Sequence, residues 1–336
     1  MENKIRAAKD FAKELVRNET PRRRWDGEED PLRWQAEARE KLATLLGMDR
    51  FEPCPLNVQV EFERPWCGHT ETRFTFESEA GWTVPCHMLT PKGTPKGVMI
   101  CLQGHSTGMH NSLNRKLYDG DEDAQSGDRG FAVQAADRGY IAVALEQRAF
   151  GECGGTPRPD CYHAAMMSLM VGRTLLGQRI WDVKRAIEAL KTHFGFGDLP
   201  FYCMGNSGGG TATVYAAALL EELAGAMPSC SVCTWKKSIA DTVHCACNYV
   251  PGIARYFDMG DIAALIAPRP YVQVNGKDDD IFLLDGAKEA FDGAKRVYEA
   301  LGAADKCALV VGDGEHRFYA ADAWPVFEQL TMNNEK

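Results

Sequence analysis

Three segments in the first third of the chain alternate polar and apolar positions. They span residues 58–63, 71–77 and 82–89, and residues 79–81 (Glu-Ala-Gly) separate the last two. A period of two is typical of half-buried strands, and a short turn between two such segments indicates antiparallel pairing. We therefore predict that antiparallel strands begin the folded domain.

Later segments are continuous apolar runs, and helical patterns follow them. Such runs are typical of strands that are covered on both faces, and alternating strands and helices imply a mainly parallel sheet. The sequence thus predicts an α/β fold with a doubly wound, mainly parallel sheet. The expected strands are residues 98–102, 141–145, 200–204, 226–232, 271–274 and 308–311.

One of the intervening helices shows a clear apolar stripe. Ile180, Val183, Ile187 and Leu190 recur at helical spacing, whereas charged residues such as Asp182 and Arg185 lie on its other faces. This pattern predicts a helix that packs one side on the sheet. The longest stretch without a regular pattern is residues 104–128, and a loop of that length is usually functional.

Two helical patterns precede the strands, at residues 3–16 and 32–46, and a charged linker lies between them. We expect residues 1–50 to form a helical extension and residues 51–336 to form one large α/β domain. The extension could cover the core, make an oligomer contact or border the site entrance.

Composition narrows the range of functions. The chain has 336 residues, 45% of them hydrophobic, and a net charge of −9, which argues against a nucleic-acid surface. It shows no apolar signal segment at its start and no stretch of about 18 apolar residues that would span a membrane. We expect a soluble cytoplasmic protein that acts on a small molecule, and assembly into a homo-oligomer stays open. Its twelve cysteines should be thiols.

Residues 205–209, Gly-Asn-Ser-Gly-Gly, fit the pattern G-x-S-x-G. A short apolar strand precedes them and a helix rich in alanine and leucine follows, which is the context in which a sharp turn lifts the serine hydroxyl clear of the backbone. Side chains at the flanking positions would clash in such a turn, so glycine is needed there. We predict that Ser207 is a nucleophile.

A serine nucleophile needs a histidine base, and the base needs a carboxylate to orient it. Two histidines follow the serine in sequence, and His316 comes after an apolar run, as the base should. The acid should lie in the acidic turn at residues 278–280. Three adjacent aspartates leave its register open, and we favour Asp279 over Asp278 and Asp280.

The tetrahedral intermediate of acyl transfer needs two main-chain N–H donors. Gly208 follows the nucleophile and supplies the first, and His105, just after the run at residues 98–102, is our candidate for the second through its main chain. The His105 ring could contact substrate or be structural. We also predict substrate contacts from Gln103, Asn206 and Tyr249.

The sequence does not favour a metal site. Cys230, Cys233, His244, Cys245 and Cys247 carry thiolate and imidazole groups that bind zinc, but the first pair reads as the end of a strand and lacks the spacing of a metal knuckle. We expect neither a metal nor another cofactor, and interpret residues 244–252 as a wall of the substrate pocket.

With these motifs assembled, the chain from residue 51 onward resembles the α/β-hydrolase superfamily, and within it the dienelactone hydrolase-like and acetyl xylan esterase-like carboxylesterases. The resemblance rests on residues 103–105, 146–152, 176–182, 205–209, 278–280 and His316. Gln103 stands where these esterases usually have histidine, and Ala149-Phe150 stands where secreted carbohydrate deacetylases have Gly-Gln.

The resemblance implies that Ser207, Asp279 and His316 form the catalytic triad of a serine carboxylic-ester hydrolase for short, acetyl-type esters, possibly of carbohydrates. It also implies a buried ion pair between Arg148 and Asp182. Peptidase, thioesterase and lactonase activities use the same triad and stay open as alternatives, as does a hydrolase-fold protein that only binds a ligand.

Overall fold

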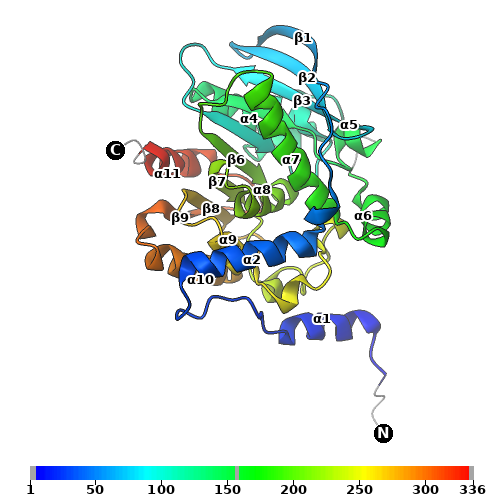
Figure 1. Cartoon of the computed structure of the whole chain (residues 1–336), viewed down its shortest axis with the longest axis vertical. Helices are drawn as coiled ribbons and strands as arrows, with labels where there is room; N and C mark the ends of the chain where they lie inside the picture. Colours follow the sequence, from blue (N-terminus) through cyan, green and yellow to red (C-terminus); the bar gives the residue numbers. More distant parts are fainter. Residues whose placement is uncertain (1–4, 156–158, 333–336) are drawn as a thin grey trace.

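A nine-stranded sheet forms the centre of the molecule (Figure 1). The computed structural model describes residues 5–155 and 159–332. Strand order across the sheet is β1-β2-β3-β5-β4-β6-β7-β8-β9, with antiparallel pairing as far as β5 and parallel pairing from β5 to β9. The strands are β1 (Gln59–Trp66), β2 (His69–Glu79), β3 (Trp82–Thr90), β4 (Val98–Leu102), β5 (Ile141–Leu145), β6 (Phe201–Asn206), β7 (Leu223–Ser229), β8 (Tyr271–Gly276) and β9 (Cys307–Gly312).

Helices cover both faces of this sheet. They are α1 (Ala8–Asn18), α2 (Pro31–Leu46), α3 (Asp121–Ser126), α4 (Phe131–Asp137), α5 (Gly151–Gly154), α6 (Cys161–Met170), α7 (Leu175–Thr192), α8 (Gly208–Leu219), α9 (Met259–Ala264), α10 (Leu284–Ala300) and α11 (Ala320–Met332). Short 3₁₀ helices are η1 (Met48–Arg50), η2 (Met109–Leu113), η3 (Trp235–Lys237), η4 (Ala246–Asn248), η5 (Ile253–Arg255) and η6 (Ala304–Lys306).

The two faces of the sheet belong to two separate core clusters. Val98, Ile100 and Leu102 of β4 pack with α2, α7, α8, α9 and α10, whereas Met99 and Cys101 of the same strand pack with α4 and α11. Successive strand residues point to opposite faces, so a continuous apolar run supplies both cores. The predicted α/β class and mainly parallel sheet are confirmed.

Some predicted details were wrong. The strand expected at residues 226–232 is β7, which ends at Ser229 because Cys230 adopts a left-handed backbone with φ +45°. Helix α7 was expected to pack one side on the sheet, yet Asp182 and Arg185, on its other faces, are buried as well. The stretch at residues 104–128 was expected to be irregular, yet it contains η2 and α3.

The N-terminal helices differ in how they contact the rest of the chain. Asp30 caps α2 by accepting a hydrogen bond from the Arg33 N–H, and α2 buries Trp34, Leu42 and Leu46 in the core that the sheet shares. Helix α1 buries no residue and lies at the lower edge of Figure 1. It begins at Ala8, and the first two residues of the helix predicted at 3–16 lie outside the described part of the chain.

Across the described ranges, no helix is both long enough and apolar enough to cross a lipid bilayer. The twelve cysteines form no disulfide bonds with one another.

Candidate active site

The turn between β6 and α8 holds Ser207 in a strained conformation. Its φ of +54° and ψ of −122° lie in a region that residues other than glycine rarely adopt. The Ser207 N–H donates to the Ser229 carbonyl at 2.9 Å, and the Thr211 N–H donates to the Ser207 carbonyl at 2.8 Å. These bonds to β7 and to the first turn of α8 stabilise the sharp turn.

The flanking glycines are required by close contact with β4. A Cβ atom on Gly205 would lie 2.5 Å from the Leu102 carbonyl oxygen, and one on Gly209 would lie 2.0 Å from the same atom. Both distances are far below van der Waals contact. The predicted steric reason for glycine at the two positions is therefore confirmed.

The loops after β8 and β9 bring an aspartate and a histidine together. His316 Nδ1 lies 2.9 Å from Asp279 Oδ2, and Asp279 Oδ1 accepts hydrogen bonds from the N–H groups of Ile281 and Phe282. Burial raises the pKa of Asp279, but the hydrogen bond and charge of His316 and the two N–H donors outweigh it, so the pKa lies below its ordinary value. This aspartate is ionised and faces the imidazole.

The two neighbouring aspartates do not share this environment. Asp278 is exposed and lies 3.9 Å from the Lys277 ammonium, and Asp280 is exposed. The structure thus pairs His316 with the aspartate that the sequence analysis favoured, although the catalytic roles stay predictions.

The end of β7 joins the serine turn to the histidine loop. Ser229 Oγ donates to Asn206 Oδ1 at 2.9 Å and also lies 3.3 Å from the Arg317 carbonyl. Asn206 precedes the nucleophile candidate and Arg317 follows His316. A single buried serine therefore contacts both segments, which places the two candidate catalytic loops side by side.

The loop after β4 packs against the serine turn. A Cβ atom on Gly104 would lie 3.1 Å from Ser207 Cβ, and one on Gly208 would lie 2.6 Å from Cε1 of the His105 ring. Gly104 therefore packs against Ser207, and the His105 side chain packs against Gly208. The loop after β4 and the first residue of α8 are thus in contact, and the donor roles of Gly208 and His105 stay predictions.

The three predicted substrate contacts have different surroundings. Gln103 is buried, and its amide donates to Ser112 Oγ at 2.7 Å and to the Arg129 carbonyl at 2.8 Å. Asn206 is likewise buried and bonded to Ser229. Tyr249 is 45% exposed and borders an apolar cavity of about 550 Å³ beside α1. The hydrogen bonds of Gln103 and Asn206 hold neighbouring loops together. Tyr249 borders the apolar cavity beside α1, which none of the predicted catalytic residues lines.

Comparisons with known proteins agree with this fold. No protein-family model matches the chain. It is 25% identical over 292 residues to a Bacillus subtilis (strain 168) protein described as “Putative hydrolase YtaP”, an alignment that covers 85% of this chain and 95% of that protein. Among solved structures, a “putative acetyl xylan esterase” from Bacteroides fragilis NCTC 9343 superposes with a TM-score of 0.76 at 15% identity, covering 98% of this chain and 90% of the other. The chain has the α/β-hydrolase fold.

A second solved structure supports this statement. A glucuronoyl esterase from Solibacter usitatus superposes with a TM-score of 0.67 at 14% identity, and the match covers 92% of this chain and 94% of the esterase. The predicted resemblance to esterases of the α/β-hydrolase superfamily is thereby confirmed in architecture. At this level of identity the match describes the fold alone.

Two buried acidic residues make hydrogen bonds near the site, and the sequence analysis anticipated the contacts of only one of them. Arg148 donates from Nε and Nη2 to the two carboxylate oxygens of Asp182, each at 2.7 Å, which confirms the buried ion pair that the resemblance implied. Glu146 was not singled out as a functional residue. Its carboxylate accepts from the Met109 N–H at 3.2 Å and the Glu152 N–H at 3.4 Å. An acidic residue directly after the apolar run 141–145 was the available signal.

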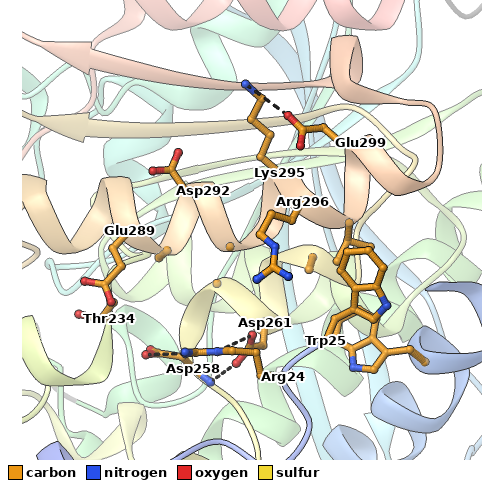
Figure 2. A pocket seen from close by; sticks show the side chains of 16 residues that line it. Arg24, Trp25, Thr234, Asp258, Asp261, Glu289, Asp292, Lys295, Arg296 and Glu299 are labelled. Atoms are coloured by element: carbon orange, nitrogen blue, oxygen red, sulfur yellow. Dashed lines mark hydrogen bonds and ion pairs between the residues drawn. The ribbon is translucent and has the colours of Figure 1, made fainter. Parts of the chain in front are cut away.

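A large cavity lies elsewhere in this fold. It has a volume of about 440 Å³ and lies between the segment around Trp25 and helices α9 and α10, where Arg24 pairs with Asp258 and Asp261 at 3.4 Å each (Figure 2). Among the described residues that line it, none is a predicted catalytic residue. We therefore assign it no part in the chemistry.

The cysteines and histidine weighed as a metal site do not converge as one group. Cys230 lies beside Asp279 and His316, Cys233 Sγ lies 3.5 Å from the Leu283 carbonyl, and His244 contacts Ser238. Cys245 and Cys247 lie together with two other residues that the sequence pattern did not connect to them.

Proposed function

We propose that the chain is a serine carboxylic-ester hydrolase that acts on short acyl esters through Ser207, His316 and Asp279. The observation that carries the proposal is the 2.9 Å contact between His316 Nδ1 and the buried Asp279, on loops adjacent to a serine in the strained turn of an α/β-hydrolase fold. A serine alone is a weak nucleophile, so it needs the base that this histidine–aspartate pair would supply.

In the proposed reaction, Ser207 Oγ attacks the ester carbonyl while His316 Nε2 accepts the hydroxyl proton. Asp279 holds Nδ1 protonated and stabilises the imidazolium that forms. The N–H groups of Gly208 and His105 stabilise the oxyanion. His316 then protonates the leaving alcohol, and a water molecule that it deprotonates hydrolyses the acyl-enzyme to release the acid and restore Ser207.

Crowding around the serine favours a small acyl group. The His105 ring lies against Gly208, and the Phe282 ring stacks on His316 with their centroids 6.0 Å apart. One ring thus lies next to the residue after the proposed nucleophile and the other next to the proposed base, and we infer that they limit the size of the acyl group. The similarity to an acetyl xylan esterase and a glucuronoyl esterase is compatible with a carbohydrate ester as the substrate.

Hydrolysis of p-nitrophenyl esters from acetate to octanoate tests the proposal. We expect activity that falls with acyl length and drops at least about a thousandfold in Ser207→Ala and in His316→Ala, because both residues act in the same transition state. His193→Ala, which changes an exposed histidine at the end of α7, is the matched control and should keep the native rate.

Other outcomes would redirect the assignment. Activity that survives in Ser207→Ala would contradict the proposed nucleophile. A native chain that hydrolyses thioesters, lactones or peptides but not simple esters would keep the triad and change the substrate class. A chain without turnover on any of these acyl compounds would favour the ligand-binding alternative.

A further inference from the structure

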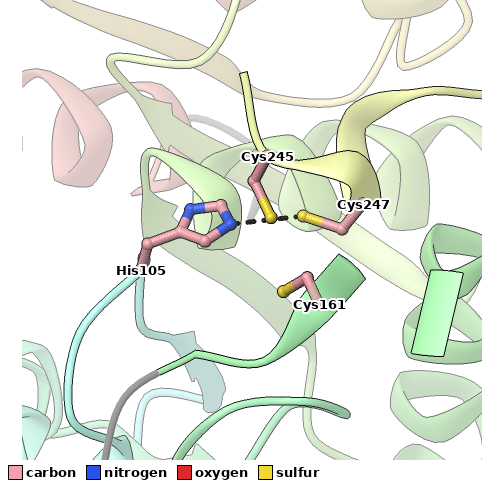
Figure 3. A group of neighbouring side chains, drawn as sticks. All are labelled: His105, Cys161, Cys245 and Cys247. Carbon is pink, nitrogen blue, oxygen red and sulfur yellow. Dashed lines mark hydrogen bonds between the residues drawn. The ribbon is translucent and has the colours of Figure 1, made fainter. Parts of the chain in front are cut away.

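Four side chains from three separate segments meet beside the candidate active site. They are His105 from the loop after β4, Cys161 at the start of α6, and Cys245 and Cys247 on either side of Ala246 in η4. Their nitrogen and sulfur ligand atoms all lie within 4.8 Å of one another. Figure 3 shows the imidazole and the three thiol groups pointing toward a common centre.

The donor set and its dimensions match one type of metal site. A zinc ion bound at about 2.3 Å to sulfur and about 2.0–2.1 Å to nitrogen in a tetrahedron leaves its ligand atoms roughly 3.5–3.8 Å apart. The His105 Nε2 and Cys247 Sγ atoms are already 3.2 Å apart. Small side-chain rotations would bring the four atoms to tetrahedral positions. Three cysteines and one histidine are a common ligand set of structural zinc sites.

A buried positive charge next to the cluster supplies an independent argument. Arg179 of α7 is only 1% exposed, and its Nη2 lies 3.3 Å from Cys161 Sγ. The guanidinium also donates to the Arg148 carbonyl and interacts with the Cys247 thiol, and none of these described partners is a carboxylate. A guanidinium buried in this way requires a compensating negative charge.

Zinc coordination would provide that charge. Three thiolates, a neutral imidazole and Zn²⁺ sum to one negative charge, which the Arg179 guanidinium balances. Three uncharged thiols would leave the guanidinium without a counter-ion. The Arg179 side chain also packs over the Phe150 ring at 4.2 Å, and this ring contacts the His105 imidazole. The cation is therefore fixed in place beside the proposed ion.

We propose that His105, Cys161, Cys245 and Cys247 bind one Zn²⁺ ion as a closed, four-coordinate structural site. The ion would tie the loop after β4 to α6 and to the segment around η4. It has no open coordination position for water or substrate, so it stabilises the site and takes no part in the chemical step. This proposal replaces the expectation of a metal-free protein and does not depend on the esterase assignment.

Metal analysis of the full chain, purified under reducing conditions from zinc-supplemented cells, tests the proposal. We expect one zinc per chain, and loss of most of that zinc in Cys161→Ser and in Cys247→Ser. Cys67→Ser is the matched control, because Cys67 is exposed in the turn between β1 and β2, and this variant should keep its zinc.

X-ray absorption of the native zinc protein covers the case in which the variants do not fold. It should give three sulfur ligands at about 2.3 Å and one nitrogen at about 2.0–2.1 Å. A reduced, folded native chain that carries no zinc and binds none on dialysis against zinc chloride would overturn the proposal. So would a disulfide among Cys161, Cys245 and Cys247 in protein whose thiols were blocked at lysis.

Metal loss should also have a kinetic consequence if the esterase proposal holds. The His105 ring belongs to the cluster and also packs against Gly208, so an ordered cluster would fix the main chain that supplies the predicted oxyanion donor. Removal of zinc by a chelator should then lower kcat more than it raises KM, and zinc should restore kcat. The zinc content tests the metal proposal by itself. The change in kcat is expected only if both the metal proposal and the esterase proposal are correct.

Discussion

At the scale of single residues, the environment separates side chains that the sequence leaves equivalent. Residues 278–280 are three adjacent aspartates, yet Asp279 is buried and accepts two main-chain hydrogen bonds while its neighbours face solvent. The turn after β8 creates this difference, because it directs one carboxylate toward His316. The chemistry therefore depends on a register that spacing cannot determine.

This register yields a matched set of variants. Asp279→Asn should lower kcat by about 10⁴, because an amide at this position favours the wrong tautomer of the imidazole. Asp278→Asn and Asp280→Asn remove the same charge from exposed positions and should stay close to native activity. Steady-state kinetics on p-nitrophenyl acetate measures all three. Equal losses in the three variants would argue against Asp279 as the orienting acid.

Local sequence was informative where the chain itself imposes the geometry. The glycines of the serine turn could be predicted because each packs on the β4 backbone within a motif of fixed spacing. The group of His105, Cys161, Cys245 and Cys247 could not, since three segments far apart in sequence contribute to it. Sequence proximity instead connected Cys245 and Cys247 to Cys230 and Cys233, which the fold directs elsewhere.

At the scale of elements, the loops at the carboxyl ends of the strands carry the candidate chemistry. Glu146, directly after β5, accepts main-chain hydrogen bonds from Met109 and Glu152 and thus links two of these loops. Burial raises the pKa of Glu146 to about 7, although the hydrogen bonds from the two N–H groups lower it in part. An ionised carboxylate held in this position at neutral pH costs stability.

Glu146→Gln should therefore change how stability depends on pH. The folded chain holds a proton on Glu146 up to about pH 7, whereas the unfolded chain releases it near pH 4.5, so stability falls as pH rises between these values. The glutamine keeps an acceptor without the titration. Relative to that of the native chain, the free energy of unfolding of the variant should rise by about 1–3 kcal/mol between pH 5 and pH 8.

Urea unfolding at the two pH values measures this effect. Glu52→Gln is the control, because Glu52 is exposed, and its pH dependence should match that of the native chain. The same slope for Glu146→Gln and the native chain would show that Glu146 is already ionised throughout this range.

Element boundaries show where the pattern of apolar residues has limits. The continuous apolar runs predicted the parallel strands well, because both faces of this part of the sheet are buried. The end of β7 was misplaced because Cys230 and Val232 are apolar and buried although the backbone has already left the strand. Burial alone does not mark a strand; the left-handed turn at Cys230 depends on packing that an apolar pattern does not record.

At the scale of the whole molecule, the order of the strands is what brings the site together. Parallel strands β4 to β9 end at one edge of the sheet, so loops separated by more than two hundred residues meet there. Two solved structures described as esterases have the same architecture at 14–15% identity, so the match describes the fold alone. Function must therefore be tested at the residues of the site.

Labelling with a fluorophosphonate, followed by peptide mapping, tests the central claim most directly, because it reports an activated serine without knowledge of the substrate. We predict a single covalent adduct on Ser207 in the folded chain, formed much more slowly in His316→Ala and absent after unfolding. A folded native chain that forms no adduct, or forms it on another serine, would contradict the assignment of Ser207 as the nucleophile.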